Sequence, residues 1–290
     1  MAEKKALHEN SMWRISLIRL RRNKLAMFGL FFLLLLLAAA LFGPLFTPFE
    51  RDATNMSNIY QPPSAEHWLG TDEVGRDVFT RLLYGARVSL AVGFMATLFS
   101  LVIGMTLGSL AGFLGGVVDG VVMRIVDIFM CFPYFVIAIA AAAAFGPSMF
   151  NVMLITGILT WPQFARIVRG EVITLKQREF IEASRATGLG TAYTIFRHII
   201  PNVFGVIAVY ATLGIANGIL SEAGLSYLGL GVKAPMPSWG NMLAAAQSLR
   251  SLRMHWWLWM PPGALVFLTI LSINFLGDGL RDALDPKLKR

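Results

Sequence analysis

Six long apolar runs alternate with polar stretches along the chain. Each run has about the length, roughly 17–25 residues, that an α-helix needs to cross the hydrocarbon core of a bilayer. The runs span residues 25–43, 88–113, 128–146, 149–165, 203–221 and 261–277, and the third is expected to begin as early as residue 118. The pattern predicts an all-α, polytopic membrane protein with six transmembrane helices.

The first run also has to be compared with a cleaved signal peptide. Its apolar part is longer than the ~7–15 residues of a signal-peptide core, and 24 residues precede it. We therefore expect a retained first helix.

Lys and Arg are distributed unequally between the two sides that six helices define. Seventeen lie in the N-terminal tail, the loop after the fourth run and the C-terminal tail, whereas seven lie in the loops on the opposite side. Cytoplasmic loops of membrane proteins carry the excess of Lys and Arg. Both termini are therefore predicted to be cytoplasmic.

These assignments divide the chain into a first helix and a five-helix core. The predicted parts are a cytoplasmic N-terminal tail (1–24), the first helix (25–43), an outer loop (44–87), a core domain (88–281) with a cytoplasmic loop (166–201) and an outer loop (222–260), and a cytoplasmic C-terminal tail (282–290).

Composition supports the membrane interpretation. The chain is 56% hydrophobic and 14% charged, whereas soluble domains are about 25% charged. The net charge of +8 is explained by basic residues at the cytoplasmic helix ends. The sequence contains no basic cluster interleaved with aromatic residues, so nucleic acid is not expected as a partner. The single cysteine, Cys131, lies in an apolar run and is expected to pack as a small hydrophobic residue.

Small residues and prolines modify the predicted helices. Gly104, Gly108 and Gly112 are spaced four apart, and such stripes allow helices to approach closely in lipid. The alanine-rich stretch 138–146 offers a similar surface. Pro133 and Pro162 fall inside predicted helices and are expected to kink them.

Ionisable residues avoid the centres of the predicted helices. Glu222 is expected at the outer end of the fifth and Asp278 at the inner end of the sixth. Asp119, Arg124 and Asp127 cluster near the cytoplasmic end of the third, and Arg124 and Asp127 have the spacing of a local ion pair. Ion-coupled carriers place ionisable groups at membrane depth, so this pattern argues against such a carrier.

The cytoplasmic loop is predicted to fold into two short helices. Thr174 and Gln177 have the spacing of a capping box, which predicts a helix up to about residue 187. Gly188 and Gly190 supply the backbone freedom that ends helices.

The second short helix is expected to begin at Thr191 and to end at Pro201. On the first, Arg178, Glu182 and Arg185 share one face, with small alanines beside them. Such a helix either enters a groove on another protein or is a solvated surface helix with i,i+4 pairs.

The stretch "EASRATGLGTAYTIFRHIIP" resembles the EAA signature of ABC-importer permease subunits. Glu182, Ala183, Gly188 and Pro201 match the signature in identity and spacing. Its function in that family is to form a coupling helix that docks onto the ATP-binding subunit. The resemblance therefore implies the docking residues Arg178, Glu182, Ala183, Ser184, Arg185 and Gly188.

Three residues depart from the signature. Ser184 keeps a small volume and Ile200 an apolar character, whereas His198 replaces a residue that would help to seat the second short helix.

Further stretches resemble the second permease of the dipeptide, oligopeptide and nickel importer group. They are residues 67–93, 220–243 and 276–290, so the likeness extends over almost the whole chain. The turn-rich "GTDEVGRD" and the proline-stiffened "KAPMPSWG" are expected in outer loops, where they either brace the mouth of a pathway or contact a binding protein. The implied structural residues are Gly70, Asp72, Gly75, Arg76, Asp77, Arg124, Asp127, Pro201, Gly277, Asp278 and Asp282.

The resemblance implies the type I permease fold and a set of partners. These are a second homologous permease, two ATP-binding subunits, an extracytoplasmic substrate-binding protein and the lipid bilayer of a bacterial or archaeal cytoplasmic membrane. No P-loop, metal-ligand spacing or nucleophile–base set occurs in the sequence, so catalysis, cofactor and metal are not expected here, and ATP and Mg²⁺ belong to the partner subunits.

The sequence leaves open which molecule is transported and which class of membrane protein the chain belongs to. Peptides are favoured, with nickel or other metal chelates, glutathione and haem as alternatives, and a membrane-embedded enzyme or an ion-coupled carrier as competing classes. Five residues with polar edges lie inside predicted helices without an assigned role: Tyr134, Tyr210, Asn217, Asn151 and Trp161.

Overall fold

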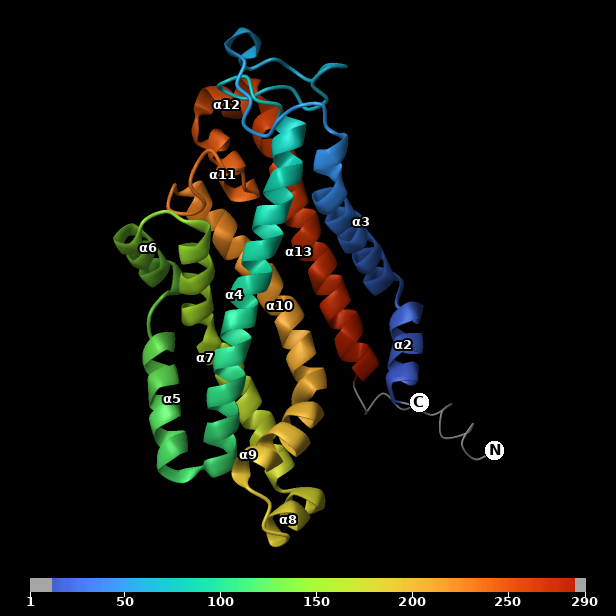
Figure 1. Cartoon of the computed structure of the whole chain (residues 1–290), viewed down its shortest axis with the longest axis vertical. Coiled ribbons are helices and arrows are strands. Elements are labelled where there is room, and N and C mark those ends of the chain that lie inside the picture. The colour runs from blue at the N-terminus through green and yellow to red at the C-terminus, as the bar shows by residue number, and fades with distance from the viewer. Residues whose placement is uncertain (1–11, 285–290) are drawn as a thin grey trace.

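The predicted all-α architecture is confirmed. A computed structural model describes residues 12–284, without the side chains of residues 12–16 and 185. Within that range it contains helices, turns and loops but no β-strand (Figure 1). The α-helices are α2 (Met12–Arg22), α3 (Lys24–Phe46), α4 (Val78–Leu114), α5 (Gly116–Met130), α6 (Tyr134–Phe145), α7 (Met149–Lys176), α8 (Glu179–Ala186), α9 (Thr191–Thr194), α10 (Ile200–Tyr227), α11 (Trp239–Leu243), α12 (Leu249–Met254) and α13 (Trp256–Leu284).

Four helical segments between residues 12 and 284 are long and apolar enough to cross a membrane. They are α3, α4, α13 and Thr191–Tyr227, which joins α9 to α10. The bent pair α5 and α6 forms a fifth candidate. The fourth predicted run (149–165) forms the first part of α7, which is not among these candidates. The second half of α7 carries Arg166, Arg169, Glu171 and Lys176. The apolar pattern thus predicted the helices well, but α7 extends beyond the apolar run into a charged segment.

The third predicted span is not one straight helix. It breaks at residues 131–133, and α5 and α6 meet at an angle of 84°. Pro133 lies in this break and lacks the N–H that a continuing helix needs. Pro162, by contrast, lies within α7, and the helix continues past it.

Glycines determine how closely α4 approaches its neighbours. A Cβ atom built on Gly104 would lie 2.5 Å from Phe164 Cβ, and one on Gly108 would lie 2.5 Å from the Ala165 carbonyl oxygen. On the other side of α4, a Cβ on Gly218 of α10 would lie 3.0 Å from Gly93 Cα. The predicted glycine stripe is confirmed as the contact between α4 and α7.

The predicted ion pair between Arg124 and Asp127 is absent. Asp127 instead lies 2.8 Å from Arg166 of α7, and Asp119 pairs with Arg169 of α7. The two arginines lie one turn apart on α7 and face α5. Arg166 therefore takes the place that local spacing had assigned to Arg124 as the partner of Asp127. Arg124 is exposed.

The predicted capping box at Thr174 is wrong. Thr174 lies inside α7, where its hydroxyl donates to the Gly170 carbonyl oxygen at 3.1 Å, and Gln177 follows the last residue of the helix. Packing of Val168 and Val172 in a core cluster keeps α7 helical through this stretch. The tertiary contacts outweigh the local capping signal.

The second short helix does not end at Pro201. A π-helical turn, Ile195–Ile199, follows α9, and the Ile200 N–H bonds to the Ile195 carbonyl oxygen. Pro201 then occupies the first turn of α10, where a proline is tolerated because no intrahelical N–H bond is required. The end of this loop, from Thr191, and the fifth apolar run therefore form one continuous helical segment, Thr191–Tyr227.

The outer end of the molecule is closed by the loop 47–77 together with α11 and α12 (Figure 1). Asp77 caps α4 by accepting hydrogen bonds from the Thr80 N–H and hydroxyl, both at 2.7 Å. Asp72 accepts from the backbone of Val74 and Arg76 and from the Arg76 side chain. The motif "GTDEVGRD" therefore folds into a compact turn that starts α4.

Helix α2 occupies part of the predicted N-terminal tail and packs against α13. A Cβ on Gly279 of α13 would lie 2.3 Å from Ala26 Cβ and 3.1 Å from Leu20. In Figure 1 the start of α2 and the end of α13 lie toward the end of the molecule that carries α8. The first and last described residues therefore lie toward the same end of the molecule as α8.

Candidate functional site

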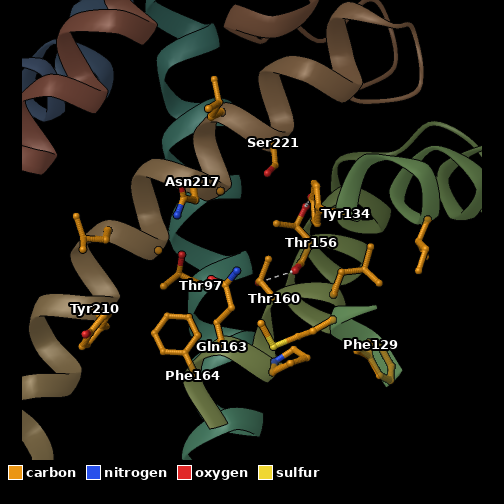
Figure 2. A pocket seen from close by; sticks show the side chains of 18 of the residues that line it. Thr97, Phe129, Tyr134, Thr156, Thr160, Gln163, Phe164, Tyr210, Asn217 and Ser221 are labelled. Carbon is orange, nitrogen blue, oxygen red and sulfur yellow. Dashed lines mark hydrogen bonds between the residues drawn. The ribbon is translucent and has the colours of Figure 1, made fainter. Parts of the chain in front are cut away.

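A large cavity opens between α5, α6, α7 and α10 (Figure 2). Its volume is about 640 Å³, within the size range of small-molecule sites. Thr97 contributes from α4, and the break between α5 and α6 brings aromatic residues of that hinge to the wall. The bent third segment and the close contact of α4 with α7 therefore create the cavity.

The wall combines aromatic residues with neutral polar groups. The polar lining residues are Thr97, Tyr134, Thr156, Thr160, Gln163, Tyr210, Asn217 and Ser221. Some of these groups hold one another: Tyr134 Oη lies 3.1 Å from Thr156 Oγ1, and the Thr160 hydroxyl donates to the Thr156 carbonyl oxygen at 2.7 Å. Gln163 and Asn217 are exposed to the cavity and have no hydrogen-bond partner within the described chain.

No charged side chain lines this cavity among the described residues. Glu222 follows Ser221 on α10, but its side chain is fully buried on another face of the helix. Its carboxylate accepts hydrogen bonds from Ser89 at 2.8 Å and Ser226 at 2.6 Å. The carboxylate therefore supports the wall without facing the space.

The five residues with polar edges separate into two groups. Tyr134, Tyr210 and Asn217 line the cavity. Asn151 instead donates to the Phe145 and Gly146 carbonyl oxygens, each at 3.0 Å, and Trp161 is buried in a core cluster. Thus three of these residues face the cavity, and two have structural roles.

Gln163, Thr156 and Thr160 were not singled out from the sequence. Their run "TGILTWPQ" reads as the end of an apolar helix interrupted by a proline. The only usable signal was the spacing of Thr156, Thr160 and Gln163, four and three apart, which places them on one helical face.

A second candidate site lies on α8, at the opposite end of the molecule from α11 and α12 (Figure 1). Two residues join α8 to α7, and the turn 187–190 joins it to α9 and α10. Both α7 and α10 line the cavity. Helix α8 is therefore connected by short segments of chain to two walls of the cavity.

Helix α8 is fixed to the protein by its buried face. Ile181 is fully buried in a core cluster with Val172 and Ile199. Ser184 is buried as well, and its hydroxyl lies 3.1 Å from that of Thr194 on α9. The serine that departs from the EAA signature thus joins the two short helices.

The opposite face of α8 is open to solvent. Arg178, Glu182 and Ala183 are exposed, with Phe180 at 43% and Leu189 at 42% of their full exposure. The side chain of Arg185 lies outside the described residues. The docking residues predicted from the signature therefore divide into an outward set and the inward-facing Ser184, and their docking role stays a prediction.

The turn after α8 requires glycine. Gly188 has φ +75°, and the Leu189 N–H bonds to the Ser184 carbonyl oxygen at 3.2 Å, as in a Schellman motif. His198 lies in the π-helical turn, with its ring centroid 5.8 Å from that of Tyr193 and 6.5 Å from that of Phe180. The histidine therefore packs α8 against α9.

The structural residues predicted from the resemblance occupy varied positions. Gly70 and Gly75 have φ of +68° and +77° and serve the outer turn. Gly277 lies where α13 crosses α10, and a Cβ there would be 2.8 Å from Thr212 Oγ1. Asp278 and Asp282 are exposed on the last turns of α13.

Comparison with known proteins identifies the family. Residues 104–290 match the family described as the binding-protein-dependent transport system inner membrane component. The chain belongs to this family. A second match, over residues 11–63, is to the N-terminal transmembrane domain of oligopeptide transport permease C. The chain is therefore an inner-membrane permease of the ABC-importer type, as the loop signature predicted.

Close relatives of this permease cover nearly its whole length. It is 47% identical over 279 residues, 96% of this chain and 91% of the relative, to the dipeptide transport system permease protein DppC of Alkalihalophilus pseudofirmus. It is 42% identical to the oligopeptide transport system permease protein OppC of Bacillus subtilis, over 100% of this chain and 94% of that protein. The glutathione transport system permease protein GsiD of Escherichia coli is also 42% identical, over 97% and 91%.

A solved structure shares the fold of this permease. A chain of the MetNI methionine ABC transporter in inward-facing conformations superposes with a TM-score of 0.55 at 19% identity, over 70% of this chain and 96% of that chain. The type I permease fold is therefore shown for the greater part of the molecule.

Proposed function

We propose that this permease forms one half of the membrane pathway of an ATP-driven importer for dipeptides and oligopeptides. The observation that carries the proposal is the uncharged cavity lined by α7 and α10, the two long helices that are joined by short segments to the exposed α8. A peptide is a zwitterion with variable side chains, and a roomy neutral wall accepts such a molecule without favouring one charge. The names of the DppC and OppC relatives support the same cargo.

The other half of the pathway comes from a second, homologous permease, and an extracytoplasmic binding protein delivers the peptide. Two ATP-binding subunits carry ATP and Mg²⁺, and one of them docks on α8 of this chain. The assembly lies in the cytoplasmic membrane of a bacterium or archaeon. Support for these partners comes from the family, which is defined by binding-protein-dependent transport.

Closure of the ATP-binding subunits moves α8, and α7 and α10 move with it. Shifting a two-state element from 1:99 to 99:1 takes roughly 5.5 kcal/mol of differential binding. Such a difference reaches the cavity only through a firmly seated helix. The buried Ile181 and the contact of Ser184 with Thr194 provide that seat.

The test is uptake into liposomes that contain the whole importer with its binding protein. ATP-dependent accumulation of a labelled dipeptide is expected, and an inactive Walker-A lysine variant of the ATP-binding subunits should abolish it. Accumulation of glutathione, haem or a nickel chelate with no peptide uptake would reassign the cargo. Peptide uptake driven by a proton gradient without ATP would refute the mechanism.

A further inference from the structure

Two carboxamides project into the cavity without a partner in the described chain. Gln163 comes from α7 and Asn217 from α10, and Figure 2 shows both side chains turned toward the space between these helices. Both residues are exposed, and neither makes a hydrogen bond to a described residue. The nearby hydroxyls of Thr156 and Thr160 are engaged with protein oxygen atoms. The two amides are therefore available to a transported molecule.

A carboxamide matches the main chain of a peptide in its hydrogen-bonding groups. Its oxygen accepts from an N–H, and its NH₂ group donates to a carbonyl oxygen. Every peptide offers these two groups, whatever its side chains are. Amides on two walls of the cavity are thus suited to hold the constant part of a variable cargo.

The remainder of the lining is neutral. It contains aromatic and aliphatic side chains and hydroxyls, and the nearby carboxylate of Glu222 is buried behind the wall with Ser89 and Ser226 as donors. Because a fixed charge acts strongly in a poorly hydrated site, its absence removes the main means by which the wall would select acidic or basic side chains.

We propose that Gln163 and Asn217 bind the main-chain amides of a peptide in transit, and that the neutral wall makes passage independent of side-chain charge. The inference rests on the proposed function, because it takes a peptide as the cargo. It adds two residues that hold the peptide main chain and the reason why one pathway serves many sequences.

The experiment installs a charge with almost no change in shape. Asn217→Asp and Gln163→Glu are each placed in the whole importer, and ATP-driven uptake of a neutral, an acidic and a basic peptide is measured with the binding protein saturated by each. We expect the ratio of basic to acidic uptake to rise about tenfold relative to wild type, as a nearby unit charge in a partly screened site implies. Asn202→Asp is the control for an added carboxylate, because Asn202 lies on α10 outside the cavity. The Asn202 amide donates to the His198 carbonyl oxygen at 2.6 Å, a bond that a carboxylate cannot make, so only the ratio of basic to acidic uptake is compared. The ratio of basic to acidic uptake should be the same in Asn202→Asp as in wild type.

A second pair of variants removes hydrogen bonding without adding charge. Asn217→Leu and Gln163→Met should slow the uptake of all three peptides by a similar factor of about ten and leave their ratio unchanged. The amount of assembled importer in the membrane is measured alongside, so that uptake is expressed per complex. Unchanged uptake in both pairs, with peptide transport intact in wild type, would overturn the inference and leave the proposed function standing. Absence of ATP-driven peptide uptake in wild type would overturn the proposed function itself.

Discussion

The hydroxyl of Ser89 on α4 donates a hydrogen bond of 2.8 Å to the carboxylate of Glu222 on α10. Ser89 also accepts from the backbone N–H of Trp239 at 3.1 Å, and Ser226 donates to the other carboxylate oxygen at 2.6 Å. The Val232 N–H bonds to Ser226 in turn. One buried acid therefore ties the outer loop and α11 to the two helices beneath them.

The first prediction concerns the loss of this acid. Glu222→Ala should lower stability by about 3 kcal/mol, because it leaves two buried hydroxyls without their acceptor. Glu222→Gln keeps one acceptor oxygen and should cost about 1 kcal/mol. Thermal unfolding of the purified importer in detergent measures the difference, with the exposed Glu66 changed to Ala as control. Equal effects at positions 222 and 66 would show that the network does not hold the outer loop.

The contact between α4 and α7 gives the second prediction. A Cβ at Gly108 would lie 2.5 Å from a backbone oxygen of Ala165, which cannot yield as a flexible side chain does. Gly108→Ala should therefore separate the helices and destabilise the chain by about 1–3 kcal/mol. Gly120→Ala on α5 is the matched control, since nothing lies within 4 Å of its Cβ. That variant should be neutral or stabilised, as alanine favours helices over glycine by up to about 1 kcal/mol. A harmless Gly108→Ala would contradict the packing.

The start of α4 gives the third prediction. Asp77 accepts from Thr80 twice and lies 2.9 Å from Nδ1 of His67, which is also buried. Asp77→Ala should cost about 2 kcal/mol, at the upper end for loss of a helix cap. Asp77→Asn keeps an acceptor and should cost less. Limited proteolysis of the outer loop in assembled importer reports the change, and Asn55→Ala, which removes an exposed cap on the same loop, should have a much smaller effect.

The sequence predicted the long helices because apolar length is a strong signal in a membrane chain. It failed where a side chain had two possible partners. Asp127 was paired with Arg124 by local spacing, yet it bonds to Arg166 from a distant part of the chain. The break at Pro133 was expected only as a kink, since sequence alone does not show that the chain turns by 84° there.

The two candidate sites also differ in how far the sequence predicts them. The exposed face of α8 follows from the signature and the pattern of charges around Glu182. The cavity does not, because its lining residues come from five helices and their meeting depends on helix packing. Gln163 is polar in an apolar run, but only the positions of α7 and α10 show that it faces Asn217 rather than another helix or lipid.

The proposed docking face of α8 gives the last prediction. Glu182 is exposed on α8, so Glu182→Lys leaves the core intact but reverses the charge offered to a docked subunit. Gly188→Val forces a side chain into a backbone with φ +75°, at a cost of roughly 1–2 kcal/mol, and should shift α8 on its seat. Both variants should insert and assemble normally yet lose at least tenfold in peptide uptake and in stimulation of ATP hydrolysis by the loaded binding protein. Gly170→Ala, on α7 with nothing within 4 Å of its Cβ, serves as a control with normal coupling. Wild-type uptake and ATPase stimulation in Glu182→Lys and Gly188→Val would place the docking surface elsewhere on the cytoplasmic side.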